Sequence, residues 1–399
     1  MALERIVVVG GSLAGLRAVE TLRREGYEGS LIVVGDEVHR PYDRPPLSKQ
    51  ILTGEWEVEK TALPGSTEDH GAEWKLGTRA VRLDPAAREL ELSTGERVGY
   101  DGLIAATGAR VREIPGTPPL AGIHSLRTLD DALAVRSALE GSPRVCVVGA
   151  GFIGAEVAAS CRARGLDVTL VEALPVPLGR VLGDRTGAHM AKLHSDHGVD
   201  LRCGVGVDGF EGSERVEAVR LSDGTRIPAD LVVVGIGVIP NVEWLADTGL
   251  DLRDGVACDA TCATALPGVF AAGDIARWEN PLYGTAMRVE HWTHAVEQGI
   301  AAAENLLAGE GAQPFASVPF FWSDQYDTKI QMAGRPLPTD EVEIVHGEEG
   351  DHRFVVLYGR EGRLVAALGF NRARLAVQYR RAIGEGKGFA DAVADARQA

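Results

Sequence analysis

The stretch RVCVVGAGFIGAEVAASCRARGLDVTLVE, residues 144–172, decides the fold. Residues 145–148 are an apolar run of the kind that forms a buried parallel strand. Gly149, Gly151 and Gly154 follow with the G-x-G-x-x-G spacing, which favours a tight turn into a helix and close approach of the backbone to a pyrophosphate. Because the N–H groups at the start of that helix point toward the phosphates, the stretch predicts a dinucleotide site.

A second predicted strand, residues 168–171, ends at Glu172. A carboxylate at this place suits the free ribose 2′-hydroxyl of NAD and repels the 2′-phosphate of NADP. Farther along the chain, Gly235 and Gly237 in the sequence GIGV are interpreted as a backbone turn beside the same nucleotide. The site is therefore predicted to bind NAD.

A similar pattern stands near the N-terminus. The apolar residues 6–9 precede GGSLAG, in which Gly10, Ser12 and Gly15 occupy the three glycine positions. Serine replaces the middle glycine, and it is small enough for a phosphate to approach closely. A helix is predicted over residues 15–24.

The next strand, residues 31–34, leads to Asp36 and Glu37. Either residue is the expected ribose acid, and the alternative is a solvated turn. Two β-α-β units in one chain imply two dinucleotides, most simply one held tightly and one that exchanges. The fold class is therefore α/β with two Rossmann-like domains, and 399 residues leave room for a third.

Composition narrows the functional classes. The net charge of −16 argues against nucleic-acid binding. No apolar run reaches about 18 residues, so no membrane span is predicted, and the N-terminal residues lack a signal pattern, which indicates a cytoplasmic protein. The five cysteines form no C-x-x-C pair and no zinc spacing, so neither a redox disulfide nor a metal site is expected. Cys146 and Cys161 are interpreted as small buried side chains.

Apolar periodicity and turn residues predict the remaining elements. The predicted strands are a meander over 73–98, strands over 101–109, 231–235 and 269–271, short strands within 199–222, and a hairpin of residues 354–358 and 364–370. A loop over 174–183 is followed by a predicted helix over 184–197, and a further helix is predicted over 374–383. The segment RVEHWTHAVEQGIAAAENLLAG is predicted to begin as a loop and to become a helix.

Two further segments carry candidate site residues. The proline-rich stretch RPYDRPPLSKQIL contains Arg44 and Lys49, cations that could pair with a phosphate or a flavin ring edge; the alternative is a rigid surface connection. The sequence AAGD places Asp274 after a strand, where a buried acid could accept hydrogen bonds from a chain of hydroxyls.

Seven motifs make the chain similar to a known family, and they are IVVVGGSLAG, RPPLSK, LIAATGA, VVGAGFIGAEVAA, VFAAGDIAR, RVEHW and PFFWSDQYDTKIQMAG. The chain resembles the FAD-dependent pyridine-nucleotide oxidoreductases of the glutathione-reductase type. Within them it resembles the NADH:ferredoxin reductases of bacterial oxygenase systems, the family of putidaredoxin reductase and the biphenyl dioxygenase ferredoxin reductase. VEHW and FWSDQ are the most discriminating matches.

The resemblance implies three domains. An FAD-binding domain comprises residues 1–110 and 240–316, an NAD-binding domain comprises residues 111–239, and residues 317–399 form a C-terminal α+β domain. Non-covalent FAD and NADH are the implied cofactors. The resemblance assigns FAD binding to Gly10, Ser12, Leu13, Ala14, Gly15, Asp36, Glu37, Arg44, Lys49, Ala106, Thr107, Gly108, Arg127, Gly273, Asp274, Glu290, His291, Trp292 and Trp322. It assigns NAD binding to Gly149, Gly151, Phe152, Ile153, Gly154, Glu156, Glu172, Arg180, Gly235, Ile236 and Gly237.

The implied reaction passes hydride from NADH to FAD and then single electrons to a [2Fe–2S] ferredoxin. That ferredoxin would serve a Rieske dioxygenase or a haem monooxygenase. Lys49 and Glu156 match positions that flank the flavin–nicotinamide contact in such enzymes, and we predict an ion pair between them. For Glu156 the alternative is a solvated helix residue that the helix dipole stabilises.

Three points stay open from the sequence. Trp292 and Trp322 are either core side chains or flavin neighbours. A cationic cluster of Arg372, Arg374, Arg380 and Arg381 is either a ferredoxin-docking patch or a solvated helix face. The alternative functions are a rubredoxin reductase, an NADH oxidase, or an association switch like apoptosis-inducing factor in which bound NADH controls assembly.

Overall fold

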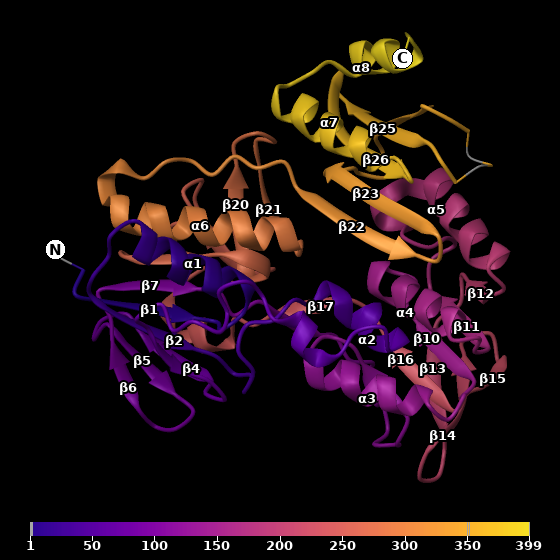
Figure 1. Ribbon diagram of the computed structural model, residues 1–399, viewed down its shortest axis with the longest axis horizontal. Coiled ribbons are helices and arrows are strands. Elements are labelled where there is room, and N and C mark those ends of the chain that lie inside the picture. Colours follow the sequence, from indigo (N-terminus) through magenta and orange to yellow (C-terminus); the bar gives the residue numbers. More distant parts are fainter. Residues whose placement is uncertain (1–2, 349, 351, 399) are drawn as a thin grey trace. The chain divides into compact units, whose positions relative to one another are not determined.

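The computed structural model describes residues 3–348, 350 and 352–398 (Figure 1). The chain divides into two compact units. The first contains Met1–Asp43, Thr61–Arg110 and Ile239–Pro319, and the second contains Arg44–Lys60, Val111–Val238 and Phe320–Ala399. The chain passes between the units within the short strands β8 (Ala109–Val111) and β17 (Val238–Pro240). The three-domain division stays a prediction.

A five-stranded sheet with parallel pairing forms the centre of the first unit, in the order β19-β7-β1-β2-β3. Its strands are β1 (Arg5–Val9), β2 (Ser30–Val34), β3 (Glu73–Lys75), β7 (Gly102–Ala105) and β19 (Val269–Ala271). The strands predicted from apolar runs are thereby confirmed, except that the strand predicted over 101–109 ends at Ala105. The predicted meander is only partly right, because its first strand joins this sheet beside β2.

The period of two along β1 sends alternate side chains into two cores. Ile6 and Val8 pack with helices α1 (Leu13–Arg24) and α6 (Trp292–Ala308), which contact each other (Figure 1). Val7 and Val9 pack on the other face, against a second apolar cluster. That cluster includes residues of the antiparallel sheet β4 (Ala80–Asp84), β5 (Glu89–Leu92) and β6 (Arg97–Gly99).

The remaining elements of the first unit are short. A three-stranded sheet of β18 (Val256–Cys258), β20 (Ala276–Asn280) and β21 (Thr285–Arg288) was not predicted. The 3₁₀ segments are η3 (Glu243–Thr248), η4 (Gly273–Ile275) and η5 (Gly309–Gly311), and η2 (Val58–Thr61) ends where the chain re-enters this unit.

A second parallel sheet lies in the second unit, in the order β12-β11-β10-β16-β9. Its strands are β9 (Ile123–Ser125), β10 (Val145–Val148), β11 (Val168–Glu172), β12 (Asp200–Cys203) and β16 (Leu231–Val234). Cys146 and Val148 face an antiparallel sheet of β13 (Val207–Gly212), β14 (Val216–Leu221) and β15 (Arg226–Pro228). Helices α3 (Leu129–Leu139), α4 (Phe152–Ala163) and α5 (Gly179–Asp196) contact the strands of the parallel sheet.

Helix α5 begins earlier than the sequence predicted. Helical residues start at Gly179, within the segment predicted to be a loop, and Gly183 interrupts the helix with φ +78°. The predicted start at residue 184 follows directly after this kink. Glycine adopts positive φ at low cost, and the sequence alone did not predict the kink at this position.

The C-terminal part of the second unit is a five-stranded antiparallel sheet in the order β22-β23-β26-β25-β24. The hairpin of β25 (Val355–Arg360) and β26 (Arg363–Phe370) was predicted, as was helix α7 (Ala373–Gly384). The sequence analysis missed β22 (Phe320–Gln325), β23 (Thr328–Gly334), β24 (Glu341–Val345) and helix α8 (Phe389–Gln398).

The proline-rich segment forms η1 (Pro45–Ser48) and the short helix α2 (Gln50–Thr53), which contact α3 and α4. Within the described part of the chain, none of the helices combines the length and the apolar character needed to cross a membrane.

Candidate functional site

The first glycine loop packs tightly against the end of a neighbouring strand. Gly10 has φ +128°, and a Cβ on it would lie 2.0 Å from the carbonyl oxygen of Ala106. A Cβ on Gly15 would lie 1.9 Å from the carbonyl oxygen of Gly10. Ser12 is the N-cap of α1 and makes no side-chain capping bond. The glycines are thus required by the protein's own backbone, whereas position 12 is not.

The second glycine loop repeats this geometry. Gly149 has φ +100°, and a Cβ on it would lie 2.4 Å from the carbonyl oxygen of Gly235. A Cβ on Gly154 would lie 1.9 Å from the carbonyl oxygen of Gly149. A Cβ on Gly151 would meet nothing within 4 Å. The middle glycine therefore faces open space, where a phosphate can approach.

The start of helix α4 fits a nucleotide. Gly151 is its N-cap, with no side-chain cap and no acidic residue in the first turn, so the first N–H groups are available to an anion. Ile153 in this turn is 49% exposed, which is unusual for a large apolar side chain in a folded unit. Its neighbour Phe152 packs edge-on against Phe321, with ring centroids 4.4 Å apart. An adenosine or nicotinamide group would cover the exposed apolar surface.

The acid at the end of β11 is held by the backbone. The Glu172 carboxylate accepts hydrogen bonds from Ala150 N–H at 2.8 Å and from Leu174 N–H at 2.9 Å. Each carboxylate oxygen keeps acceptor capacity for a ribose hydroxyl. In the first unit Asp36 is exposed, while the Glu37 carboxylate accepts a hydrogen bond from the Tyr42 hydroxyl.

Predicted site residues gather at the carboxyl ends of the first sheet. Ala106, Thr107 and Gly108 follow β7, and Thr107 Oγ1 donates to the carbonyl of Asn241 at 2.8 Å. The Asn241 side chain donates back to the carbonyl of Thr107 at 2.9 Å. Ligands of open α/β sheets bind at this edge.

The AAGD segment follows β19 at the same edge. Gly273, with φ +75°, donates its N–H to Gln298 Oε1 at 2.8 Å, and Gln298 is fully buried on α6. Asp274 is half-buried rather than buried as predicted.

The VEHW motif leads into helix α6. Trp292 donates its indole N–H to Asp43 Oδ1 at 2.7 Å. Glu290 forms an ion pair with Arg288 at 2.6 Å. Burial lowers the pKa of His291 to about 4, against a smaller opposing effect of Asp274. Trp292 is half-buried and anchored by its ring nitrogen, so it is not simply a core side chain.

In the second unit Lys49 and Glu156 form the predicted ion pair, with Nζ 2.7 Å from Oε2. Glu156 is 3% exposed, so the alternative of a solvated helix residue is wrong. The same oxygen accepts a hydrogen bond from Ser48 Oγ at 2.5 Å, and Oε1 accepts one from Ser323 Oγ at 2.7 Å. The carboxylate is therefore buried and accepts hydrogen bonds from three side chains, two on Oε2 and one on Oε1.

The other predicted residues of the second unit are more scattered. Arg44 donates to the carbonyl of Arg127 at 2.7 Å. Arg180 is exposed on α5, and Trp322 is half-buried on β22. Ile236 follows Gly235 beside the second glycine loop, and Gly237 has φ +95° and accepts a hydrogen bond from Arg112 N–H at 2.9 Å.

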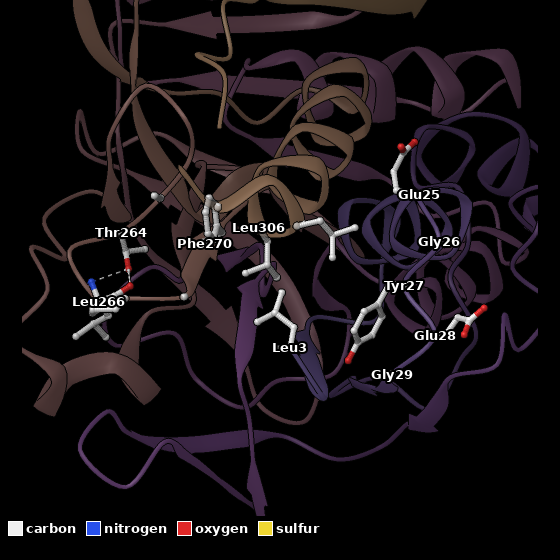
Figure 2. A pocket seen from close by; sticks show the side chains of 15 residues that line it. Leu3, Glu25, Gly26, Tyr27, Glu28, Gly29, Thr264, Leu266, Phe270 and Leu306 are labelled. Carbon is white, nitrogen blue, oxygen red and sulfur yellow. Dashed lines mark hydrogen bonds between the residues drawn. The ribbon is translucent and has the colours of Figure 1, made fainter. Parts of the chain in front are cut away.

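A surface pocket of the first unit contains none of the predicted residues. Its lining includes Leu3, Tyr27, Leu266, Phe270 and Leu306 (Figure 2). Leu3 and Tyr27 precede β1 and β2, so the pocket lies at the amino ends of these strands, opposite the nucleotide edge. It is not the dinucleotide site.

Cys146 and Cys161 are buried, as predicted. Burial raises the pKa of Cys146 and of Cys161 to about 12, which fits small buried side chains. Among the described residues no group of three histidine, cysteine or acidic side chains could hold a metal.

Sequence reasoning missed the residues that support the site. They are Asp43, Ser48, Ser160, Asn241, Gln298, Ser323 and Gln325. Ser48 stands in the RPPLSK motif, and Ser323 and Gln325 stand in the FWSDQ motif, so the only signal was their place inside those motifs.

Comparison with known proteins agrees with this geometry. Residues 4–299 match the pyridine nucleotide-disulphide oxidoreductase family, and residues 320–399 match the reductase C-terminal family. The chain belongs to the pyridine nucleotide-disulphide oxidoreductase family.

Individual relatives confirm the resemblance to the ferredoxin reductases of oxygenase systems that was found in the sequence. Rhodocoxin reductase of Rhodococcus erythropolis is 38% identical, over 92% of this chain and 87% of its own length. The ferredoxin–NAD⁺ reductase component of the anthranilate 1,2-dioxygenase system of Burkholderia cepacia is 37% identical, over 97% and 95%. The solved covalent complex of putidaredoxin reductase with putidaredoxin matches with TM-score 0.91 and 35% identity, covering 96% of this chain and 93% of that chain.

Proposed function

We propose that this protein is a ferredoxin–NAD⁺ reductase that passes electrons from NADH through FAD to a [2Fe–2S] ferredoxin of an oxygenase system. The observation that carries the proposal is the pair of matching glycine loops, each ending at a helix start that no side chain caps. When bound, FAD takes a hydride from NADH and releases its two electrons singly to ferredoxin, with one proton going to solvent. Relatives named as ferredoxin reductases support this reading over a rubredoxin reductase, an NADH oxidase or an association switch.

In this proposal the first unit holds FAD. The loop from Gly10 to Gly15 receives the pyrophosphate, Asp36 or Glu37 the ribose, and Asp274 the hydroxyl chain. Trp292, anchored on Asp43, contributes a rigid aromatic wall. The close-packed glycines and anchored side chains suit a cofactor that stays bound.

The second unit receives NADH. The helix start at Gly151 takes the pyrophosphate, and Glu172 takes the ribose hydroxyls and disfavours NADPH. The Lys49–Glu156 pair is proposed to act at the hydride-transfer step, with Glu156 also meeting the carboxamide. A buried ion pair is costly to maintain for stability alone, which supports a functional role.

The docking site for the ferredoxin is proposed on the arginine cluster of the C-terminal part. Arg380 lies over the ring of Phe320 at 5.6 Å, and Arg372 donates to the carbonyl of His346 at 2.8 Å. Arg381 pairs with Glu385 at 2.7 Å, while Arg374 is exposed. Local positive charge would steer an acidic ferredoxin despite the net charge of −16. The proposed compartment is the cytoplasm.

The test is anaerobic mixing of the yellow holoprotein with NADH or NADPH, followed by addition of a [2Fe–2S] ferredoxin. Fast flavin bleaching by NADH and then cluster reduction are expected. Faster bleaching by NADPH would contradict the role of Glu172. Bleaching without transfer to any ferredoxin would overturn the proposed partner.

Lys49→Met is expected to slow flavin reduction at saturating NADH by about tenfold or more, which corresponds to about 1.4 kcal/mol of barrier. The matched control is Lys75→Met. Lys75 also pairs with two carboxylates, at 2.7 Å from Glu73 and 3.0 Å from Glu96, but lies among no predicted site residues. Equal rates for Lys49→Met and the wild type in stopped flow would remove the ion pair from the mechanism.

A further inference from the structure

Helix α4 carries three polar side chains on one face that hold the Lys49 segment. Glu156, Ser160 and Arg164 are spaced four residues apart, which places them in one stripe. Ser160 Oγ donates to the carbonyl of Ser48 at 2.7 Å, and Arg164 Nη1 donates to the carbonyl of Leu52 at 2.9 Å. The backbone on both sides of Lys49 is therefore fixed to the helix that carries Glu156.

The second neighbour of Glu156 is strand β22, which contacts α4. Residues alternate along this strand, so that Phe321, Ser323 and Gln325 are buried while Trp322 is half-buried on the opposite side. Ser323 and Gln325 are both 0% exposed. Burial of a polar group without a partner costs about 1–3 kcal/mol. Ser323 Oγ and Gln325 Nε2 are hydrogen-bonded, whereas Gln325 Oε1 has no partner among the described residues.

The hydrogen bonds of these two side chains form a chain of donors that leads from Gln325 through Ser323 to Glu156. Gln325 Nε2 donates to Ser323 Oγ at 3.1 Å, and Ser323 Oγ donates to Glu156 Oε1 at 2.7 Å. Because the amide nitrogen can only donate, it occupies an acceptor site of the hydroxyl and directs the hydroxyl proton toward the carboxylate. Lys49 and Ser48 occupy the other carboxylate oxygen.

We propose that Ser323, oriented by Gln325, is a positioning residue that fixes the Glu156 carboxylate in the orientation needed for hydride transfer. This inference rests on the proposed role of the Lys49–Glu156 pair. It gives the C-terminal part of the chain a task at the hydride-transfer step: β22 supplies the donor for the carboxylate oxygen that Lys49 does not bind.

The test is a double-mutant cycle in the holoprotein, with Ser323→Ala, Glu156→Gln and the combined variant. Ser323→Ala is expected to lower the limiting rate of flavin reduction by about tenfold, the size expected when a hydrogen bond to a charged group is lost, while the apparent Kd for NADH changes less than twofold. In the Glu156→Gln background the same substitution is expected to change the rate less than twofold. The shifts in thermal unfolding midpoint should likewise be non-additive.

Two further variants separate positioning from general damage. Ser323→Thr keeps a hydroxyl and is expected to recover most of the rate. Ser317→Ala is the matched control, because Ser317 is a buried serine of the first unit that donates to Glu297 Oε2 at 2.6 Å; its rate should equal that of the wild type. Should Ser323→Ala not fold, Ser48→Ala removes a donor from the other oxygen and is expected to slow reduction similarly.

The outcomes are distinguishable. A slow Lys49→Met with Ser323→Ala at the wild-type rate would overturn the positioning role and keep the proposed function. Equal losses from Ser323→Ala in both backgrounds would assign it a purely structural effect. Unchanged rates in Lys49→Met and Glu156→Gln would reject the role of the ion pair itself.

Discussion

The two glycine loops of this chain share a backbone and differ in their surroundings. In each, the third glycine would place a Cβ 1.9 Å from the carbonyl of the first. In each, the first glycine lies against the end of a neighbouring strand, at Ala106 or Gly235. The middle position is Ser12 in one loop and Gly151 in the other. The protein's own packing therefore fixes two glycines, and only the ligand constrains the third.

The helices that follow the two loops, α1 and α4, differ in the polarity of the residues that they bury. The residues that α1 buries are apolar apart from Thr21, as in a helix that only covers a sheet. Helix α4 buries Glu156 and Ser160, which cost free energy unless they are paired. The two helices therefore differ in what they bury: α1 covers its sheet with apolar side chains, whereas α4 holds polar groups, which fits the proposed role of Glu156 in hydride transfer.

The largest expected effect comes from the third glycine of each loop. Gly15→Ala and Gly154→Ala each create a contact that the backbone must move to relieve, and each is expected to lower the free energy of unfolding by about 2–3 kcal/mol. Gly15→Ala should also lose FAD on gel filtration. Gly154→Ala should stay yellow and lose reduction by NADH. Urea unfolding, flavin absorbance and stopped flow measure the three properties.

Gly141→Ala is the control for this pair, because a Cβ there meets nothing within 4 Å. It should match the wild type in stability, colour and rate. Loss of FAD from Gly154→Ala as complete as from Gly15→Ala would break the assignment of one nucleotide to each loop.

The sequence predicted the fold best where continuous apolar runs form buried strands. Most strands of both parallel sheets and the glycine turns were predicted, because buried parallel strands are continuous apolar runs. Strand β9 (Ile123–Ser125), which is only half-buried, was not predicted. Strand β22 was missed for a physical reason. Its buried face carries Ser323 and Gln325, so the apolar alternation that indicates a strand is absent. The polar residues that bind Glu156 are therefore the reason why this strand was not predicted.

The candidate site was predicted unevenly for a related reason. Motifs indicated the residues that would touch a ligand, and the Lys49–Glu156 pair was found where expected. The partners that orient them, such as Asn241 at Thr107 and Gln298 at Gly273, lie 134 and 25 residues away in sequence. Contacts of that kind depend on the fold and leave no local spacing pattern.

An effect of intermediate size concerns the dependence of stability on pH. In the second unit, burial lowers the pKa of the fully buried His194 to about 4, with a smaller contribution from His197. The unfolded chain binds this proton near pH 6.5, so stability present at pH 7 is lost as the pH falls from about 6.5 to about 4. Between pH 7 and 5 the wild type is expected to lose about 2 kcal/mol more than His194→Asn.

His194→Asn keeps a polar atom near the position of Nδ1, which lies 2.8 Å from the Tyr326 hydroxyl. The measurement is urea unfolding at a series of pH values. Burial also lowers the pKa of His291 in the first unit to about 4. Because His291 is present in both proteins, its contribution cancels in this comparison. Parallel pH curves for His194→Asn and the wild type would contradict the assignment of the acid sensitivity to His194.

The smallest expected effect is also the most direct test of the difference between the two glycine loops. Ser12→Gly and Gly151→Ser exchange the two middle residues, and neither position requires positive φ, with −124° at Ser12 and −72° at Gly151. Each should change the free energy of unfolding by no more than about 0.5 kcal/mol, since glycine and serine differ little as N-caps. Gly151→Ser should nevertheless weaken NADH binding a few-fold, because its side chain enters the space left for the phosphate, while Ser12→Gly should leave FAD retention unchanged. Titration of NADH binding and flavin release on dilution measure the two effects, and a Ser12→Gly protein that sheds FAD would show that the serine itself binds the cofactor.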